Sequence, residues 1–298
     1  MDEGWINETK ALMYTVLKRQ LVEDAFKWLE EKALLINPEQ TANHLFAAFA
    51  IAPRKTGREM IKLTEAEVIN IRLAGKGFSI SGWTIDRLTR AWLLMQVDDQ
   101  DREAYCKKIE SLFRDAEMNE LVALYSSLPF FSYPETWQLR TAEGIRSNIG
   151  NVLEAIMYEN PYPFNYLSEQ AWNQMVLKAF FTDKQVDRIL GLDERANKPL
   201  SDILVDYAKE RWAAHRSVHP QLWRLVSPFI DNDNFLNIKK LFNNGNHIEK
   251  QAAALACYHS RYEPARQLLA GEPSLYNAIS KNLLNWHTIN TLVQESKN

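Results

Sequence analysis

Apolar residues recur at intervals of three and four along almost the whole chain of 298 residues, and this period constrains the fold more than any other feature. It is the period of an amphipathic helix, and no stretch shows the alternating pattern of a strand. Successive helix pairs after about residue 199 suggest stacked hairpins, although no strict repeat is present. The pattern predicts an all-α fold, a multi-helical and α-solenoid-like superhelical body, with residues 1–298 in a single domain.

Prolines and Gly-Asn clusters punctuate the predicted helices. These helices cover residues 5–33, 41–51, 64–74, 82–97, 102–116, 117–128, 136–158, 169–182, 199–216, 220–227, 231–243, 246–259, 262–270 and 274–295. Ser168 is placed to cap one of them, and Asn197 or Lys198 precedes Pro199 at the start of another. Both are arrangements that satisfy the first N–H groups of a helix.

The composition of the chain argues against several classes of protein. The chain has 35 basic and 38 acidic residues, a net charge of −3, which argues against a general nucleic-acid binder because such proteins gather Lys and Arg against phosphates. The longest uncharged apolar run, 45–52, is far shorter than the roughly 20 residues that a membrane span needs. The acidic first residues do not resemble a secretory signal, and the two cysteines are expected to be free thiols. We therefore expect a cytoplasmic protein without a membrane span.

The run Asn160-Pro161-Tyr162-Pro163 predicts a rigid break that leads into the next helix. Asn173, Gln174 and Lys178 lie close together at the start of that helix. These polar side chains could orient a polar ligand, or they could cap the helix ends that the corner exposes. For Asn173 we favour capping and packing.

Arg211 and His215 continue the apolar stripe of the predicted helix 199–216. A buried guanidinium keeps its charge, so it needs a carboxylate or an anionic ligand beside it. Three interpretations stay open: a structural ion pair, a ligand pocket, or a shifted register that leaves both residues in water. Glu154, on the polar side of the predicted helix 136–158, is in turn a surface residue, a partner of Arg211, or a general base.

No recognisable metal, nucleotide or nucleophile motif is present, so we expect no cofactor and no metal. His215 and His219 have a spacing compatible with a metal, but Pro220 follows directly and no other ligand stands nearby. Asp231-Asn232-Asp233 is better explained as a helix cap than as a calcium loop, because Phe235 and Leu236 occupy positions that need a ligand and a glycine.

The middle of the chain carries several specific runs: Arg146-Ser147-Asn148, Glu154-Ala155-Ile156, Asn160-Pro161-Tyr162-Pro163, and residues 172–179, 191–197 and 206–216. Together they resemble the EboA family, with a weaker likeness from about Pro53 to Ala254. Ser147 and Leu153 depart from the threonine and phenylalanine expected there. The resemblance implies a bacterial protein without an assigned activity and without catalytic residues to carry over.

The resemblance also implies a pathway. EboA genes lie in clusters with a UbiA-like prenyltransferase, a TatD-like hydrolase, a dehydroquinate-synthase-like enzyme and a sugar-isomerase-like barrel. In cyanobacteria such clusters are linked to export of a pigment precursor. By analogy, this chain helps to make or move a small, prenylated or otherwise specialised secondary metabolite.

Our leading hypothesis is a non-catalytic helical protein that binds a small metabolite or scaffolds pathway proteins of the same gene cluster. The alternative is an enzyme of that pathway that uses Glu154 or His215 as acid or base beside Arg211. A third interpretation is that the polar residues only tie helices together. The candidate ligand-binding residues are Arg146, Asn148, Glu154, Asn160, Tyr162, Asn173, Gln174, Lys178, Arg211 and His215.

Overall fold

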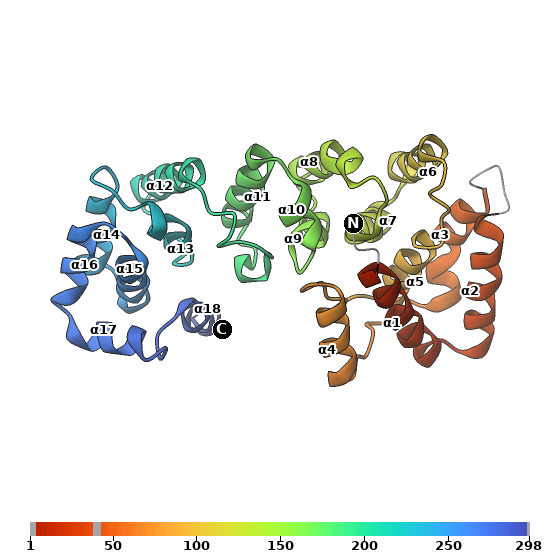
Figure 1. The fold of residues 1–298 in the computed structure, drawn as a ribbon, viewed down its shortest axis with the longest axis horizontal. Helices are drawn as coiled ribbons and strands as arrows, with labels where there is room; N and C mark the ends of the chain where they lie inside the picture. Colours follow the sequence, from red (N-terminus) through yellow and green to blue (C-terminus); the bar gives the residue numbers. More distant parts are fainter. Residues whose placement is uncertain (1–3, 38–42, 297–298) are drawn as a thin grey trace. The chain divides into compact units, whose positions relative to one another are not determined.

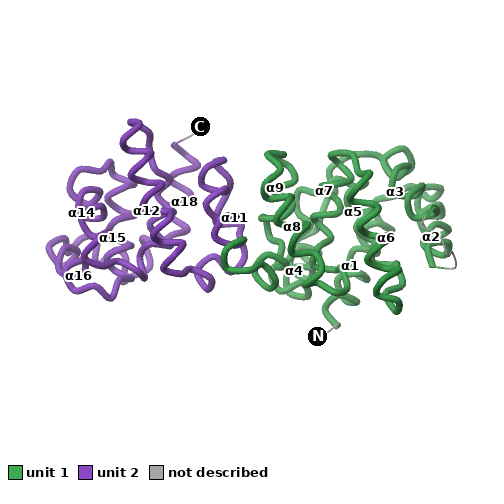
Figure 2. The backbone as a smooth tube through the Cα atoms, turned by 90° about the horizontal axis from the view of Figure 1, so that it is seen from above, with its two compact units in different colours: residues 1–171 green, residues 172–298 purple. Residues whose placement is uncertain are grey.

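The computed structural model describes residues 4–37 and 43–296, and across this part of the chain the regular structure is helical, which confirms the all-α prediction (Figure 1). One isolated β-bridge joins Met60 and Thr84. The chain divides into two compact units, residues 1–171 and 172–298 (Figure 2), which are described separately here. The single domain and the solenoid arrangement stay predictions. Within the described ranges, no helix combines the length and the apolar character needed to cross a lipid bilayer.

Unit 1 is built around α5 (Ile85–Leu94), whose residues are all buried except Arg87. Helices α1 (Gly4–Gln20), α3 (Asn43–Thr56) and α7 (Met118–Ser126) pack against it, and α7 in turn packs on α9 (Gly150–Met157). The remaining elements of unit 1 are α2 (Glu23–Ile36), α4 (Glu65–Ala74), α6 (Arg102–Asp115), η1 (Leu128–Phe130), η2 (Pro134–Trp137), α8 (Gln138–Arg146) and α10 (Pro161–Tyr166).

A buried arginine ties three of these helices together. The guanidinium of Arg90, on α5, lies 2.7 Å from the Asp86 carboxylate and donates to the carbonyl of Phe49 on α3 at 2.8 Å. The carboxylate of Glu120 on α7 lies 3.7 Å away. A buried charge is tolerated only when it is paired and hydrogen-bonded, and the partners of Arg90 come from α3, α5 and α7.

Unit 2 is built around α15 (His247–His259), in which residues 252–257 are all buried. Helices α13 (Leu222–Val226), α14 (Phe235–Asn244), α16 (Glu263–Ala270), α17 (Pro273–Ser280) and α18 (Trp286–Glu295) pack against it. Gln221 donates to the carbonyl of Trp286 at 2.5 Å, and Ser227 donates to that of Ala256 at 3.0 Å. The unit also contains η3 (Val186–Arg188), α12 (Lys198–Ala213) and η4 (Ser227–Phe229), and α11 (Glu169–Phe181) crosses from one unit into the other.

Three long predicted helices are wrong because each is interrupted. The helix expected over 274–295 is split into α17 and α18 by residues 281–285. The helix expected over 5–33 breaks at Leu21 and Val22, where Val22 is extended (ψ 155°) and caps the start of α2. Glu23 and Asp24 then occupy the first turn of α2, where carboxylates are favoured. The helix expected over 136–158 is likewise split into α8 and α9 by residues 147–149. The predicted helix 41–51 corresponds to α3, and its residues 41 and 42 lie outside the described residues.

Helix α8 packs closely against α7 and α9 at Gly144. A Cβ atom placed there would stand 2.6 Å from the Tyr125 ring on α7 and 2.7 Å from the Ile156 side chain on α9. Ser147 is the C-cap residue of α8, and its hydroxyl donates to the carbonyl of Gly144 at 2.8 Å.

Two of the three predicted helix caps are confirmed. The third, at Asp231-Asn232-Asp233, is wrong, because Asn234 holds the N-cap position of α14 and the Asp231 carboxylate accepts from the N–H groups of Asp233 and Asn234 in the turn before it. The Ser168 hydroxyl accepts from the N–H of Ala171 at 3.3 Å at the start of α11. The Asn197 side chain accepts from the N–H of Leu200 at 2.9 Å, and Pro199 stands in the first turn of α12.

We expect Gly144→Ala to destabilise the protein. Alanine gains about 1 kcal/mol over glycine inside a helix, but overpacking costs about 1–3 kcal/mol, and the two side chains at Gly144 leave no room. The net loss, up to about 2 kcal/mol, would appear as a lower midpoint of urea unfolding. Leu139→Ala is the control, because Leu139 is 80% exposed on the same helix. A Gly144→Ala protein more stable than wild type would contradict the packing argument.

Candidate functional site

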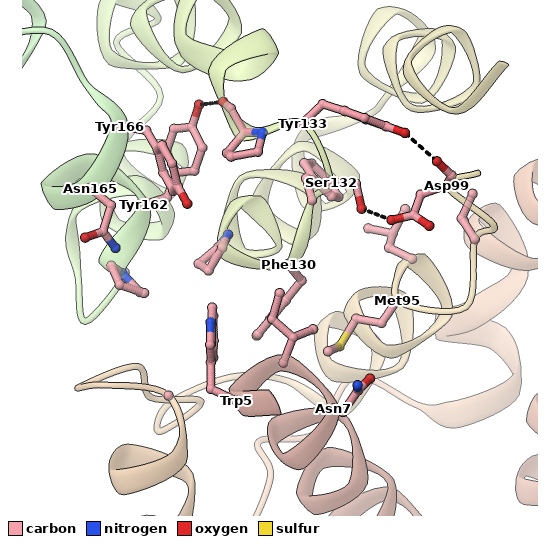
Figure 3. Close-up of a pocket in the computed structure, with 18 of the residues that line it drawn as sticks. Trp5, Asn7, Met95, Asp99, Phe130, Ser132, Tyr133, Tyr162, Asn165 and Tyr166 are labelled. Atoms are coloured by element: carbon pink, nitrogen blue, oxygen red, sulfur yellow. Dashed lines mark hydrogen bonds between the residues drawn. The ribbon is translucent and has the colours of Figure 1, made fainter. Parts of the chain in front are cut away.

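A cavity of about 930 Å³ opens in unit 1 (Figure 3). Its walls come from segments far apart in the sequence: the first turn of α1 (residues 5–7), the end of α4 (75–76), the end of α5 and the loop after it (within 94–99), Tyr105 on α6, the segment 129–135, and α10. Because the walls belong to one compact unit, the cavity is a property of unit 1 alone.

The wall around Tyr133 is held in an unusual conformation. Tyr133 has a left-handed backbone (φ 56°) directly before Pro134, which begins η2. Such a backbone costs an L residue about 1–2 kcal/mol. The Tyr133 hydroxyl offsets part of that cost by donating to the Asp99 carbonyl at 2.6 Å, and the Arg102 guanidinium lies 5.2 Å from the centre of its ring. The hydroxyl of Ser132 donates to the Asp99 carboxylate (Figure 3), so this stretch and the loop after α5 are joined at one end of the cavity.

The opposite wall depends on Asn160. Its amide nitrogen donates to the carbonyls of Tyr125, at 3.1 Å, and Ala155, at 2.9 Å, and its oxygen accepts from the N–H of Tyr162 at 3.0 Å. The side chain is buried, so these bonds satisfy backbone groups that water does not reach. Asn160 therefore shapes the corner, and its polar atoms are already engaged by the backbone.

Tyr162 connects the Asn160 corner to the cavity. Its hydroxyl donates to the carbonyl of Pro134 at 2.6 Å, which fixes α10 against the start of η2 (Figure 3). Burial raises the pKa of Tyr162. The ring of Tyr166 lies 5.2 Å from that of Tyr162, and Asn165 beside it also lines the cavity.

Further aromatic side chains close the cavity from α1 and η1. The ring of Trp5 lies 5.8 Å from that of Phe130, which packs edge-on against Phe78 at 4.9 Å. Lys10, one turn further along α1 from Trp5, donates to the carbonyl of Met95 at 2.9 Å and so joins α1 to the end of α5. Burial lowers the pKa of Lys10.

Of the ten predicted ligand-binding residues, only Tyr162 lines this cavity. Arg146 is exposed at the end of α8, Asn148 is exposed in the connection from α8 to α9, and Glu154 is half-buried on α9. The expected grouping of these three residues with the corner is therefore not observed at the cavity.

The predicted residues on α11 lie in unit 2. Asn173 is buried, and its amide forms a reciprocal pair with that of Asn197, with N–O distances of 3.0 and 2.9 Å. Asn197 is also the cap of α12, so the pair joins α11 to the start of α12. Gln174 is exposed and Lys178 is half-buried.

The expected helix 199–216 is too long, and this changes the placement of Arg211 and His215. Helix α12 ends at Ala213, and the N–H of Arg216 closes the end by bonding the carbonyl of Arg211 at 2.9 Å. His215 is exposed and left-handed (φ 54°), as the residue after a helix end often is. Arg211 is half-buried, and its Nε donates to the carbonyl of Ser217 at 3.0 Å. The requirement for a carboxylate partner, which assumed full burial, therefore does not arise.

A second cavity, of about 430 Å³, lies in unit 2 between α15, α17 and α18, and none of the predicted residues lines it. In the ranges 4–37 and 43–296, no group of three or more His, Cys, Asp or Glu side chains could hold a metal ion. Glu154 belongs to unit 1, whereas Arg211 and His215 belong to unit 2, so their joint action as a catalytic group stays a prediction.

A family model described as metabolite traffic protein EboA matches residues 9–227. The chain belongs to the EboA family. The match includes every segment of the unit 1 cavity except the first turn of α1, and it ends within unit 2. Comparison of this EboA chain with curated proteins found no match, and neither did comparison with solved structures.

Most residues that line the cavity of this EboA chain were missed by sequence reasoning. One signal was present: Pro129-Phe130-Phe131-Ser132-Tyr133-Pro134 places aromatic residues between two prolines, much as the Asn160 corner does. Trp5 and Asp99 carried no comparable signal, because their role depends on which distant segments meet.

Tyrosine ionisation tests the burial of Tyr105 and Tyr162 in the cavity wall and of Tyr125 on α7. Burial raises the pKa of Tyr125 to about 12 and also raises the pKa of Tyr105 and Tyr162. A raised tyrosine pKa favours the neutral form in the folded state, so its stabilisation is complete below about pH 10 and is lost as the pH rises further. We expect the absorbance of phenolate to show that some tyrosines ionise well above about pH 10 in the folded protein. In urea the same tyrosines should ionise near about pH 10. A folded titration identical to the unfolded one would contradict this.

Asn173→Ala should destabilise unit 2, because it leaves the Asn197 amide without its reciprocal partner. We expect a loss of about 1–3 kcal/mol. Gln174→Ala, on the same helix but exposed, should cost less than about 0.5 kcal/mol. Equal effects of the two substitutions in urea unfolding would show that the amide pair contributes nothing.

Proposed function

We propose that this EboA chain is a non-catalytic protein that binds a small metabolite in the cavity of unit 1 and presents it to proteins of the same pathway. The observation that supports this most is the cavity itself. Its volume of about 930 Å³ lies within the usual range of small-molecule sites. The family description, metabolite traffic protein, agrees with a role in handling a metabolite and not with a particular reaction.

The lining has the composition of a ligand site. Such sites combine apolar and aromatic walls with a few placed polar groups that orient the ligand. The aromatic residues of this cavity are Trp5, Tyr105, Phe130, Phe131, Tyr133, Tyr162 and Tyr166. Its polar side chains include Asn7, Asp99, Ser132 and Asn165.

The walls are also held in place without a ligand. The bonds from Asn160 fix α10, the bond from Tyr162 fixes the start of η2, and the bond from Tyr133 fixes the loop after α5. A site that is already ordered loses less conformational entropy when it binds. Preorganisation of this kind supports binding of a defined ligand over adaptation to many.

The enzyme alternative places the chemistry on Glu154 or His215. Neither residue lines the cavity of unit 1, and His215 is exposed at the end of α12. In our proposal Glu154, Arg211 and His215 therefore make no contact with the metabolite. A cytoplasmic location is part of the proposal, because the metabolite would be collected where the pathway enzymes make it.

The test uses N-phenyl-1-naphthylamine, an uncharged aromatic fluorophore that brightens when it enters an apolar site. We expect wild-type protein to bind it and Asn165→Trp to weaken binding at least about tenfold, because the larger side chain takes up part of the cavity. Glu169→Trp is the matched control, since Glu169 is exposed outside the cavity.

If the wild type does not brighten the fluorophore, or if Asn165→Trp binds it as well as Glu169→Trp does, the cavity of unit 1 is not the binding site. Circular dichroism of each variant shows that the substitution leaves the fold intact. Binding that survives Asn165→Trp would point instead to the second cavity in unit 2.

A further inference from the structure

We propose that the cavity of unit 1 selects a ligand that joins an aromatic ring to a positively charged, hydrogen-bond-donating end, as an aromatic amine does. This inference rests on the proposed function and names the chemical class of its ligand. It follows from the arrangement of carboxylates and ring faces around the cavity.

The polar end of the cavity is organised around the Asp99 carboxylate. The Ser132 hydroxyl donates to this carboxylate, and the Tyr133 hydroxyl donates to the Asp99 backbone carbonyl at 2.6 Å. An ionised carboxylate is an acceptor with about four lone-pair positions, so Ser132 leaves room for a donor from a ligand. Glu135, in the first turn of η2, adds a second carboxylate to the lining.

The balance of charge favours a cationic ligand. Among the described residues that line the cavity, Asp99 and Glu135 are acidic and Lys76 alone is a lysine or arginine. Lys10 is not part of the lining, and its ammonium donates to the carbonyl of Met95. The guanidinium of Arg102, on α6, lies over the ring of Tyr133.

One feature acts in the opposite direction. The first turn of α1 borders the cavity, and helix N-termini favour negative charge. That effect is equivalent to about half a charge and falls off within one turn, whereas the two carboxylates carry full charges. The two carboxylates therefore still outweigh Lys76 together with this half charge.

Part of the aromatic lining lies apart from the Asp99 carboxylate, whereas Tyr133 lies beside Asp99. Figure 3 shows Trp5, Tyr162 and Tyr166 toward one side and Asp99 with Ser132 toward the other. Rings of this kind stack with an aromatic ligand, and their negative faces attract an adjacent cation. A molecule with a ring at one end and an ammonium at the other matches both parts.

The experiment compares three small probes with the same ring: 2-phenylethylamine, 2-phenylethanol and 3-phenylpropanoate, which are cationic, neutral and anionic near neutral pH. Binding is measured by ligand-observed NMR, and only the part abolished by Asn165→Trp is counted. We expect the amine to bind most tightly and the carboxylate most weakly, with at least about a fivefold difference, because each partly exposed charge contributes modestly.

Asp99→Asn keeps an oxygen that can accept from Ser132 but removes the charge, so it should reduce the preference for the amine over the alcohol. Glu135→Gln is a second variant, on an exposed side chain, in case Asp99→Asn fails to fold. Glu103→Gln, which removes an exposed carboxylate from α6 outside the cavity, is the control.

The outcomes separate the two proposals. Equal binding of the three probes, or tightest binding of the anion, overturns the charge preference and leaves the proposed function standing. Failure of all three probes and of N-phenyl-1-naphthylamine overturns the proposed function itself. A preference that persists in both Asp99→Asn and Glu135→Gln overturns the assignment to these carboxylates.

Discussion

The architecture of the cavity depends on the side chain of Asn160. The ends of α7 and α9 and the start of α10 meet at one buried point, and each brings a backbone group that its own helix cannot satisfy. The Asn160 amide bonds to all three groups: it donates to two carbonyls and accepts from the N–H of Tyr162. A continued α7 could not have satisfied the carbonyl of Tyr125, because Pro129, four residues on, has no N–H. The wall formed by α10 exists because this junction is closed.

The type of secondary structure was predictable, but the ends of several helices were not. Helical periodicity, helix-capping residues and prolines are local signals, and they gave the correct class and the caps at Ser168 and Asn197. The breaks at Val22 and after Gly144 carry no proline. They arise because packing against other helices outweighs the local preference for a continuous helix, and a single sequence does not show which surfaces will meet.

Only the part of the candidate site that a short run of sequence marks was predicted. The Asn160 corner was recognised because proline marks it, and Tyr162 does reach the cavity. Arg211 and His215 were selected on the assumption that a helical stripe continues into a buried face. Helix α12 ends at Ala213, so His215 lies beyond it. Asp99 and Trp5 are separated by more than ninety positions and line the same cavity only through the packing of α1 and α5, which no motif encodes.

The family match ends at residue 227, but the packing of unit 2 continues across that residue. Helix α13, the last helix inside the match, rests on α15, and Ser227 itself donates to the carbonyl of Ala256. The end of the family match is therefore not the end of a packed unit. In evolutionary terms, residues 228–298 are free to diverge only as far as they continue to cover α13. A relative that replaced this segment would have to supply another apolar surface in its place.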